Sequence, residues 1–223
     1  MVEQKIFIIG LPRTATTSVC LALMKLGYKT AHNAYTAQAF IDAEVIADTP
    51  VFCDYQKLDK HFPQSKFIYL TRERVSWTAS IKQLLQRMIV NLQRTDGGFN
   101  PHLKRCYHEV FSDLTQENIE SDDFLYNCYL RHQQGIESYF ENRKDDLLTI
   151  NVSEEKNLEK LIAFLALPKN MLKPKEISTS KAKLNEHQFE LINMGGKVRA
   201  WQDINNPLKI ESTNKGRIDK ILY

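Results

Sequence analysis

The chain has 223 residues, of which 43% are hydrophobic and 26% are charged, which is typical of a single globular domain. Thirty basic against 27 acidic residues leave a net charge of only +3, so we expect no nucleic-acid partner. No stretch approaches the ~20 apolar residues of a membrane span, and no secretory signal pattern precedes the first motif. We therefore expect a cytoplasmic protein with no membrane span.

The first predicted unit is a strand, a tight loop and a helix over residues 5–27. Ile6–Ile9 is an unbroken apolar run, as a strand buried on both faces requires. Apolar residues from Val19 to Leu26 then recur at helical spacing, and Gly27 follows as a stop signal. Such a unit directs free backbone N–H groups and the positive end of a helix dipole to one place. It predicts an anion site.

The loop of this unit is rich in hydrogen-bond donors and has no carboxylate. Its predicted ligand-binding residues are Pro12, Arg13, Thr14, Ala15, Thr16, Thr17 and Ser18. It is not a Walker A motif, which needs Gly and Lys where this chain has Ala15 and Thr16. One reading is an ordinary turn whose hydroxyls cap the helix. Because capping explains one hydroxyl and not four plus Arg13, we favour a phosphate or sulfate cradle.

Residues 28–70 divide into short elements that alternate between extended and helical patterns. The sequence predicts an extended piece and loop that holds His32, a helix over 37–47, a strand at Pro50–Cys53 that ends at Asp54, a helix over Gln56–Phe62 and a strand at Lys66–Leu70.

A second polar motif, TRERVSWTAS at 71–80, follows the strand that ends at Leu70. Arg72 stands at the strand end, and Ser80 lies eight residues later on a long helix whose period includes Trp77 and Ile81. We expect this helix to begin with free N–H groups. An arginine and a hydroxyl that converge there predict a second anion site, separate from the first loop. The ligand should then carry two separated anionic groups.

The remainder of the chain is less regular. We expect residues 94–121 to form a mobile insertion or lid, 122–144 to form a helix, LLTI at 147–150 to form a strand, a helix to follow Ser153, and 169–223 to form an irregular C-terminal extension with a Gly-Gly pair near 195.

The alternation of strands and helices predicts an α/β fold. A central parallel sheet with helices on both faces makes a three-layer sandwich of the P-loop type, here as one domain over residues 1–223. Ligands of such sheets bind at the carboxyl ends of the strands. The four cysteines lack ligand spacing, and we interpret His102, Cys106 and His108 as members of a polar segment, so no metal is expected.

The two motifs together carry a family resemblance. PRTATTS at 12–18 resembles the phosphosulfate-binding loop of sulfotransferases that use 3′-phosphoadenosine 5′-phosphosulfate (PAPS), and Arg72 with Ser80 resembles their 3′-phosphate site. The segment at 47–77 resembles the bacterial branch of that family. Family members often have Lys at Arg13 and usually Gly at Ala15. Trp77 is either a stacking partner for the adenine or, from its helical spacing, a core residue.

The resemblance implies transfer of a sulfuryl group from PAPS to a hydroxyl or amine, with 3′-phosphoadenosine 5′-phosphate (PAP) as product and no metal. Arg13 would stabilise the charge that develops on the leaving phosphate. The acceptor needs a general base, for which Asp54 is the first candidate and His32 the second. A helix N-cap explains Asp54 about as well, and a loop hydrogen bond explains His32. Asp48 is expected to fix a loop.

The sequence does not distinguish between a small molecule, a glycan and a lipid as the acceptor. It also does not indicate the oligomeric state. Two alternatives remain. A small-molecule P-loop kinase needs a Walker lysine, which is absent, and a strand-end carboxylate, for which Asp54 is a candidate. A non-catalytic nucleotide-binding relative on the same fold would bind PAP without turnover.

Overall fold

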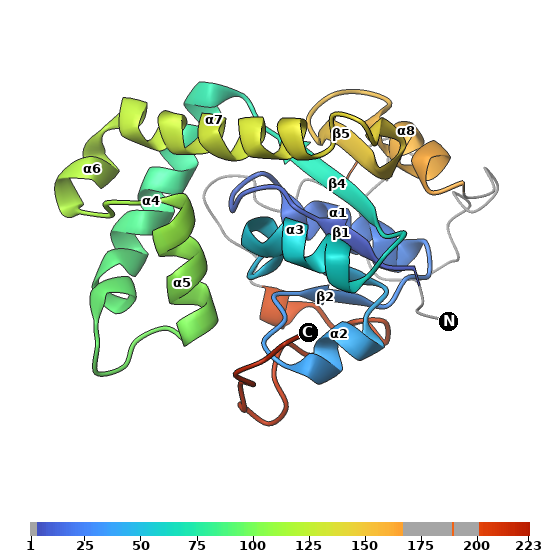
Figure 1. The fold of residues 1–223 in the computed structure, drawn as a ribbon, viewed down its shortest axis with the longest axis horizontal. Coiled ribbons are helices and arrows are strands. Elements are labelled where there is room, and N and C mark those ends of the chain that lie inside the picture. Colours follow the sequence, from blue (N-terminus) through green and yellow to red (C-terminus); the bar gives the residue numbers. More distant parts are fainter. Residues whose placement is uncertain (1–3, 167–188, 190–200) are drawn as a thin grey trace.

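The protein is described by a computed structural model over residues 4–166, 189 and 201–223 (Figure 1). Its centre is a five-stranded sheet in the order β2-β3-β1-β4-β5, in which every pair of neighbours is parallel. The strands are β1 at Ile6–Ile8, β2 at Thr30–His32, β3 at Val45–Ala47, β4 at Lys66–Thr71 and β5 at Leu147–Asn151. The predicted α/β class with a parallel sheet is confirmed.

Helices connect the strands and extend the fold on one side (Figure 1). They are α1 at Thr16–Lys25, α2 at Ala37–Asp42, α3 at Val51–His61, α4 at Arg74–Gln93, α5 at Pro101–Val110, α6 at Gln116–Glu120, α7 at Asp122–Tyr139 and α8 at Asn157–Phe164, with short 3-10 turns at Lys144–Asp146 and Trp201–Asp203.

The sheet is buried on both faces because successive side chains of each strand point in opposite directions. In β1, Ile6 and Ile8 pack into a cluster with residues of α1 and α8, whereas Phe7 packs into a second cluster with residues of α2, α3 and α7. All three strand side chains are 5% exposed or less. The three layers that result explain why the strands read as continuous apolar runs.

Residues 94–121 form helices rather than an open insertion. Helices α4, α5, α6 and α7 share a third hydrophobic cluster beside the sheet, and Cys106, Phe111 and Ile119 are fully buried in it. Turns remain before Asn100, whose side chain caps α5, and at residues 111–113 between α5 and α6. The predicted insertion is therefore part of the folded core, and its mobility stays a prediction.

Two elements near residue 50 differ from the sequence prediction. The expected strand at Pro50–Cys53 is wrong, since Val51 begins α3; the helix expected over 37–47 ends at Asp42, and Val45–Ala47 is β3. The apolar residues at 45–47 and 51–52 are short runs and fully buried, a case in which periodicity does not separate a strand from a buried helix turn.

The C-terminal segment 201–223 packs against the edge of the sheet. Thr30 N donates to Leu208 O at 2.8 Å, and Ile210 N donates to Thr30 O at 2.9 Å, so the segment covers the outer edge of β2. It is irregular, as expected, but it belongs to the fold. The rest of the predicted extension, including the Gly-Gly pair, lies outside the described residues.

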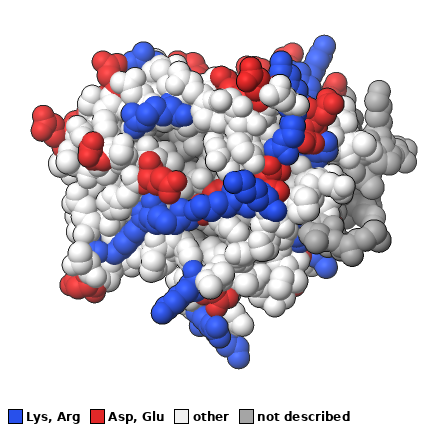
Figure 2. Space-filling view, viewed as in Figure 1, with Lys and Arg blue, Asp and Glu red and all other residues white. Residues whose placement is uncertain are grey.

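The surface carries charges of both signs. On the face shown in Figure 2, basic and acidic side chains lie beside one another, in keeping with their nearly equal numbers. Among the described helices, none combines the length and the apolar character that crossing a membrane requires.

Gly10, two residues after β1, lies close to Leu70 of the neighbouring strand β4. A Cβ at residue 10 would lie 2.6 Å from the Leu70 Cβ and 2.6 Å from the Thr14 Oγ1, closer than real contacts allow. We expect Gly10→Ala to lower the free energy of unfolding by about 2 kcal/mol, a typical overpacking cost. Urea titration measures this. Gly216→Ala, where a Cβ would meet open space, measures the strain of a positive φ without a clash.

Candidate functional site

A cavity of about 920 Å³ opens at the carboxyl ends of the strands. It brings together almost every residue that the sequence predicts for binding or catalysis. Lining it are Pro12, Arg13, Thr14, Ala15, Thr16, Thr17, Ser18, His32, Arg72 and Ser80. Asp54 is the exception, because it lines a separate cavity of about 300 Å³.

The loop after β1 is held in an unusual backbone conformation. Arg13 and Ala15 both have φ of 73°, in the left-handed region that costs a residue with a Cβ about 1 kcal/mol. Thr14 Oγ1 donates to Leu11 O at 2.7 Å, so this hydroxyl secures the loop and does not reach out to a ligand. Trp77 donates from Nε1 to Pro12 O at 3.0 Å and is fully buried. The alternative that made Trp77 a core residue is therefore correct.

The loop leads into a helix end that is open to an anion. Ala15 precedes the first residue of α1, and no side chain caps this end or adds an acidic group to its first turn. The first N–H groups of a helix have no partner within it and carry the positive end of its dipole. Since Ala15, Thr16 and Thr17 line the cavity, the helix presents this partial charge to it.

Two guanidinium groups stand beside the loop. Arg13 Nε donates to Ser80 Oγ at 2.8 Å, and Arg72 Nη1 donates to Arg13 O at 2.7 Å. Burial, and next the charges of Arg72 and Arg87, lower the pKa of Arg13, and burial lowers the pKa of Arg72. Both stay cationic near pH 7 because an arginine pKa starts above 12. Neither forms an ion pair within the described residues, so the pair is available to an anionic ligand.

The two predicted anion sites thus form one connected surface, which differs from the expectation in two respects. The first is that Arg13 from the loop and Ser80 from α4 are joined directly. The second is that the start of α4 is not free: Glu73 accepts from Val75 N and from Ser76 N, each at 2.9 Å. This carboxylate satisfies the helix end, so the donors that remain here for an anion are side chains.

His32 lies at the end of β2, on the other side of the loop from Arg72. Its Nε2 is 3.1 Å from Thr16 Oγ1, 3.2 Å from Thr17 Oγ1 and 3.5 Å from an oxygen of Asp48. Burial lowers the pKa of His32, and the nearby Asp48 opposes this shift only in part. The imidazole is therefore neutral near pH 7. The Trp201 ring stacks on it at 5.3 Å between centroids.

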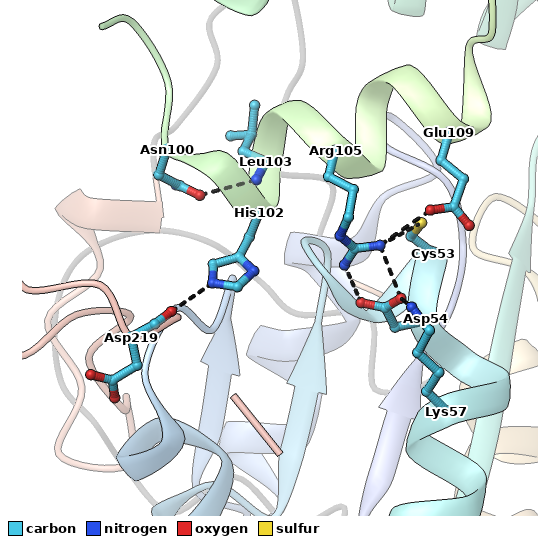
Figure 3. A network of polar contacts seen from close by, with 9 residues as sticks. All are labelled: Cys53, Asp54, Lys57, Asn100, His102, Leu103, Arg105, Glu109 and Asp219. Carbon is cyan, nitrogen blue, oxygen red and sulfur yellow. Dashed lines mark hydrogen bonds and ion pairs between the residues drawn. The ribbon is translucent and has the colours of Figure 1, made fainter. Parts of the chain in front are cut away.

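Asp54 lies in α3 rather than at a strand end, and Figure 3 shows it enclosed by cations. Its side chain is 2% exposed and receives hydrogen bonds from Arg105, through both terminal nitrogens, and from Lys57 Nζ at 3.0 Å. Burial alone would raise the pKa of Asp54, but hydrogen bonds from Arg105, Tyr223 and Lys57 outweigh it and hold the pKa below its usual value. This is the arrangement of a structural ion pair.

The ion pair predicts a pH-dependent cost for Arg105→Ala, which leaves the buried carboxylate without its main partner. We expect the free energy of unfolding to fall by about 3 kcal/mol at pH 7. Asp54 contributes stability above its unfolded-state pKa, near 4, and this contribution is lost as pH falls through the lower folded-state value. The difference from wild type should therefore shrink at pH 3. Urea titrations at both pH values measure it.

Arg94→Ala is the matched control, since Arg94 pairs with Asp96 on the surface. It should change the free energy of unfolding by less than about 0.5 kcal/mol at either pH. If Arg105→Ala lowered the free energy of unfolding by no more than this control does, the Asp54–Arg105 ion pair would contribute nothing to stability.

Several cavity residues were not singled out from the sequence. Asn100 and Tyr107 come from α5, Asn151 from the end of β5, and Ser212 with Thr213 from the C-terminal segment. An Asn-Pro pair before a helical pattern is a cap signal that points to Asn100. The C-terminal residues gave no local signal, because their place depends on pairing with Thr30, far away in the sequence.

The sequence also raised three potential metal ligands on α5, and they do not converge. His102 Nε2 lies 2.7 Å from Asp219 O, His108 Nε2 lies 3.4 Å from Leu92 O, and Cys106 is buried. Over the part of the chain that the structure describes, no group of three or more His, Cys, Asp or Glu side chains is placed to hold a metal ion.

Comparison with known families gives a match. The model of a sulfotransferase domain family matches residues 5–39 and 32–177, which include the loop, both arginines and all five strands. Comparison with curated proteins gives no match.

Proposed function

The chain belongs to the sulfotransferase domain family, and we propose that it is an enzyme that transfers a sulfuryl group from PAPS to a hydroxyl or amine. The observation that carries this proposal is the pairing of an uncapped helix end with two arginines that form no ion pair within the described residues, all in one cavity. A ligand with anionic groups at both ends suits this surface.

The donor would bind with its 5′-phosphosulfate over residues 12–18. Backbone N–H groups at the start of α1 and the hydroxyls of Thr17 and Ser18 supply donors there. The 3′-phosphate would bind to Arg72 and Ser80, which line the same cavity on the side of α4. The cavity of about 920 Å³ has room for a nucleotide and an acceptor together.

Arg13 is placed to act on the reaction itself. As the S–O bond to the leaving phosphate lengthens, negative charge grows on the bridging oxygen, and a fixed cation lowers the energy of that state. The hydrogen bond from Nε to Ser80 Oγ holds the guanidinium in position without neutralising it. It keeps the terminal nitrogens available for the donor.

We assign the role of general base to the His32–Asp48 pair, which would take the proton that the acceptor hydroxyl or amine loses. Both residues line the cavity, and they lie 3.5 Å apart beside the hydroxyls of Thr16 and Thr17. A neutral imidazole next to a carboxylate is able to take up a proton and hold the resulting charge. We do not propose Asp54 as the base, since Arg105 and Lys57 occupy its oxygens away from the cavity.

Asp48→Asn tests this assignment. It keeps the size of the side chain and removes its charge, so we expect sulfuryl transfer to slow by about 100-fold, the lower end of general-base contributions. The affinity for PAP should stay within about twofold of wild type. Single-turnover transfer from [³⁵S]PAPS and calorimetry with PAP measure the two quantities. Transfer at the wild-type rate would remove Asp48 from the mechanism.

Titration calorimetry tests the proposed donor. We expect PAP to bind in the presence of EDTA with an affinity in the micromolar range or tighter, and ATP with Mg²⁺ to bind far more weakly. Preference for ATP with Mg²⁺ would support the kinase alternative and overturn the proposal. PAP binding with no transfer to any acceptor or to water would leave a non-catalytic nucleotide-binding protein.

A further inference from the structure

The order of the strands divides the cavity into two halves. The loop after β1 lies in the middle, because β1 is the central strand. The ends of β4 and β5 and the start of α4 surround one half, which contains Arg72 and Ser80 and which we have given to the nucleotide. The ends of β2 and β3, helix α5 and the C-terminal segment surround the other half. Its residues are those an acceptor would meet.

This acceptor half offers polar groups that have no partner among the described residues. Asn100 is itself engaged, since its side-chain oxygen accepts from Leu103 N at 3.0 Å and its side chain also hydrogen-bonds with Tyr35 (Figure 3 shows the first contact). The Thr213 hydroxyl, the Gln202 side-chain amide and the Glu211 carboxylate make no hydrogen bond within the described residues. The wall therefore combines free donors with free acceptors.

The wall is also held in place. His102, two residues after Asn100, contacts Asp219 O at 2.7 Å and so joins α5 to the C-terminal segment (Figure 3). Ser212 Oγ donates to His32 O at 3.2 Å and Tyr35 N donates to Ser212 O at 2.9 Å, which fixes the segment along the cavity. Polar groups on a fixed wall recognise hydroxyls with little ordering cost.

The charge of this half is unfavourable for an anionic acceptor. Asp48 and Glu211 both line it. Lys209, the one lysine that lines it among the described residues, is engaged elsewhere, since its ammonium donates to Gln202 O at 3.2 Å and Ile204 O at 3.1 Å and lies over the Trp201 ring. A carboxylate or sulfate on the acceptor would meet two negative charges without a free cation among the described residues.

Among the described residues, few apolar side chains of this half are placed to contact an acyl chain or an aromatic ring. Leu103 is the aliphatic side chain that lines it, and Tyr35 and Tyr107 are 8% and 4% exposed. The Trp201 ring is covered by His32 on one side and approached by Lys209. Pockets for lipids and phenols are lined mainly by apolar and aromatic side chains that the ligand can reach.

We propose that the acceptor is a hydroxyl-rich compound without anionic groups, of the class of neutral sugars and amino sugars. The inference rests on the proposed transfer from PAPS and narrows its acceptor. Sugar hydroxyls both donate and accept, so they match the side-chain amide of Gln202, the hydroxyl of Thr213 and the carboxylate of Glu211. The hydroxyl to be sulfated would lie against the His32–Asp48 pair.

The test is transfer from [³⁵S]PAPS to a panel of four probe classes: neutral and amino sugars (maltose, lactose, glucosamine), a uronic acid disaccharide, 2-naphthol, and octanol in micelles. PAP affinity is measured in parallel, so that a failure of the donor proposal is seen separately. We expect a sugar of the first class to give the highest kcat/KM. Preferred transfer to naphthol, octanol or the uronic acid would overturn the inference, as would PAP binding without transfer to any sugar.

Two variants link that activity to the wall. Gln202→Met keeps the length of the side chain but removes its amide, and Thr213→Val keeps the shape but removes the hydroxyl. Each should raise the KM for the sugar about fivefold to tenfold, the worth of one hydrogen bond, with PAP affinity unchanged. Asn127→Ser, on an exposed position of α7, is the control. If neither wall variant raised the KM for the sugar above that of the control, the placement of the acceptor would be wrong.

Discussion

Arg13→Ala should slow sulfuryl transfer by 100-fold to 1,000-fold, roughly the cost of removing one preorganised donor to a developing oxyanion. The guanidinium lies at the loop after β1, is held by Ser80 and forms no ion pair within the described residues. Its charge is therefore free to stabilise the leaving phosphate. Single-turnover transfer of ³⁵S from PAPS, with donor at saturating concentration, measures the effect on the chemical step.

Two variants make this result specific. Arg13→Lys keeps the cation and should retain more activity than Arg13→Ala. It lacks the several N–H groups with which a guanidinium can bind Ser80 and the sulfuryl donor at the same time. Arg94→Ala removes a surface cation that pairs with Asp96 and should transfer at the wild-type rate. If Arg13→Ala weakened PAPS binding but left the saturated rate unchanged, Arg13 would bind the donor without stabilising the leaving group.

Arg72→Ala should weaken PAP binding by about 100-fold, as expected for the loss of charge-assisted hydrogen bonds to a phosphate. The residue stands at the end of β4, and its Nη1 bonds to Arg13 O at 2.7 Å, which aims the side chain along the cavity. Calorimetry with PAP measures the loss.

Adenosine 5′-phosphosulfate, which lacks the 3′-phosphate, is the matched ligand for this variant. Its affinity should fall far less than that of PAP, because Arg72 is assigned to the group it does not have. If both ligands lost affinity equally, Arg72 would act by supporting the loop through Arg13 O, and the assignment of the 3′-phosphate would be wrong.

Short-range patterns were enough to predict the centre of the molecule. The β1 run, the donor-rich loop and the period of α1 lie within one stretch, and each conformation is set by near neighbours. Arg72 and Ser80 followed in the same way, because a strand end and the next helix determine where they lie. The two motifs therefore located the cavity before any tertiary contact was known.

The errors arose where a side chain's role depends on distant partners. The sequence predicts Asp54 at a strand end, but Asp54 lies in α3 and Arg105, on α5, neutralises its carboxylate. The correct strand is β3, so the carboxylate at a strand end beside the loop is Asp48. Glu73 is an uncommon N-cap residue, and its two hydrogen bonds at the start of α4 were not expected from residue preferences.

The acceptor half of the cavity was the least predictable part. Thr213 and Gln202 reach it only because the C-terminal segment bonds to Thr30 at the edge of the sheet. Backbone pairing of this kind leaves no periodic signal in an irregular segment. The sequence thus identified where a donor would bind and gave little information on the acceptor.

A crystal structure of the protein with PAP tests the central claim most directly. The account predicts the 5′-phosphate at the N–H groups of residues 15–18 and the 3′-phosphate in contact with Arg72 and Ser80, with the other half of the cavity open towards His32 and Asp48. PAP bound in the opposite direction, or in the cavity beside Asp54, would contradict the assignment of the two anion sites and of the acceptor half with it.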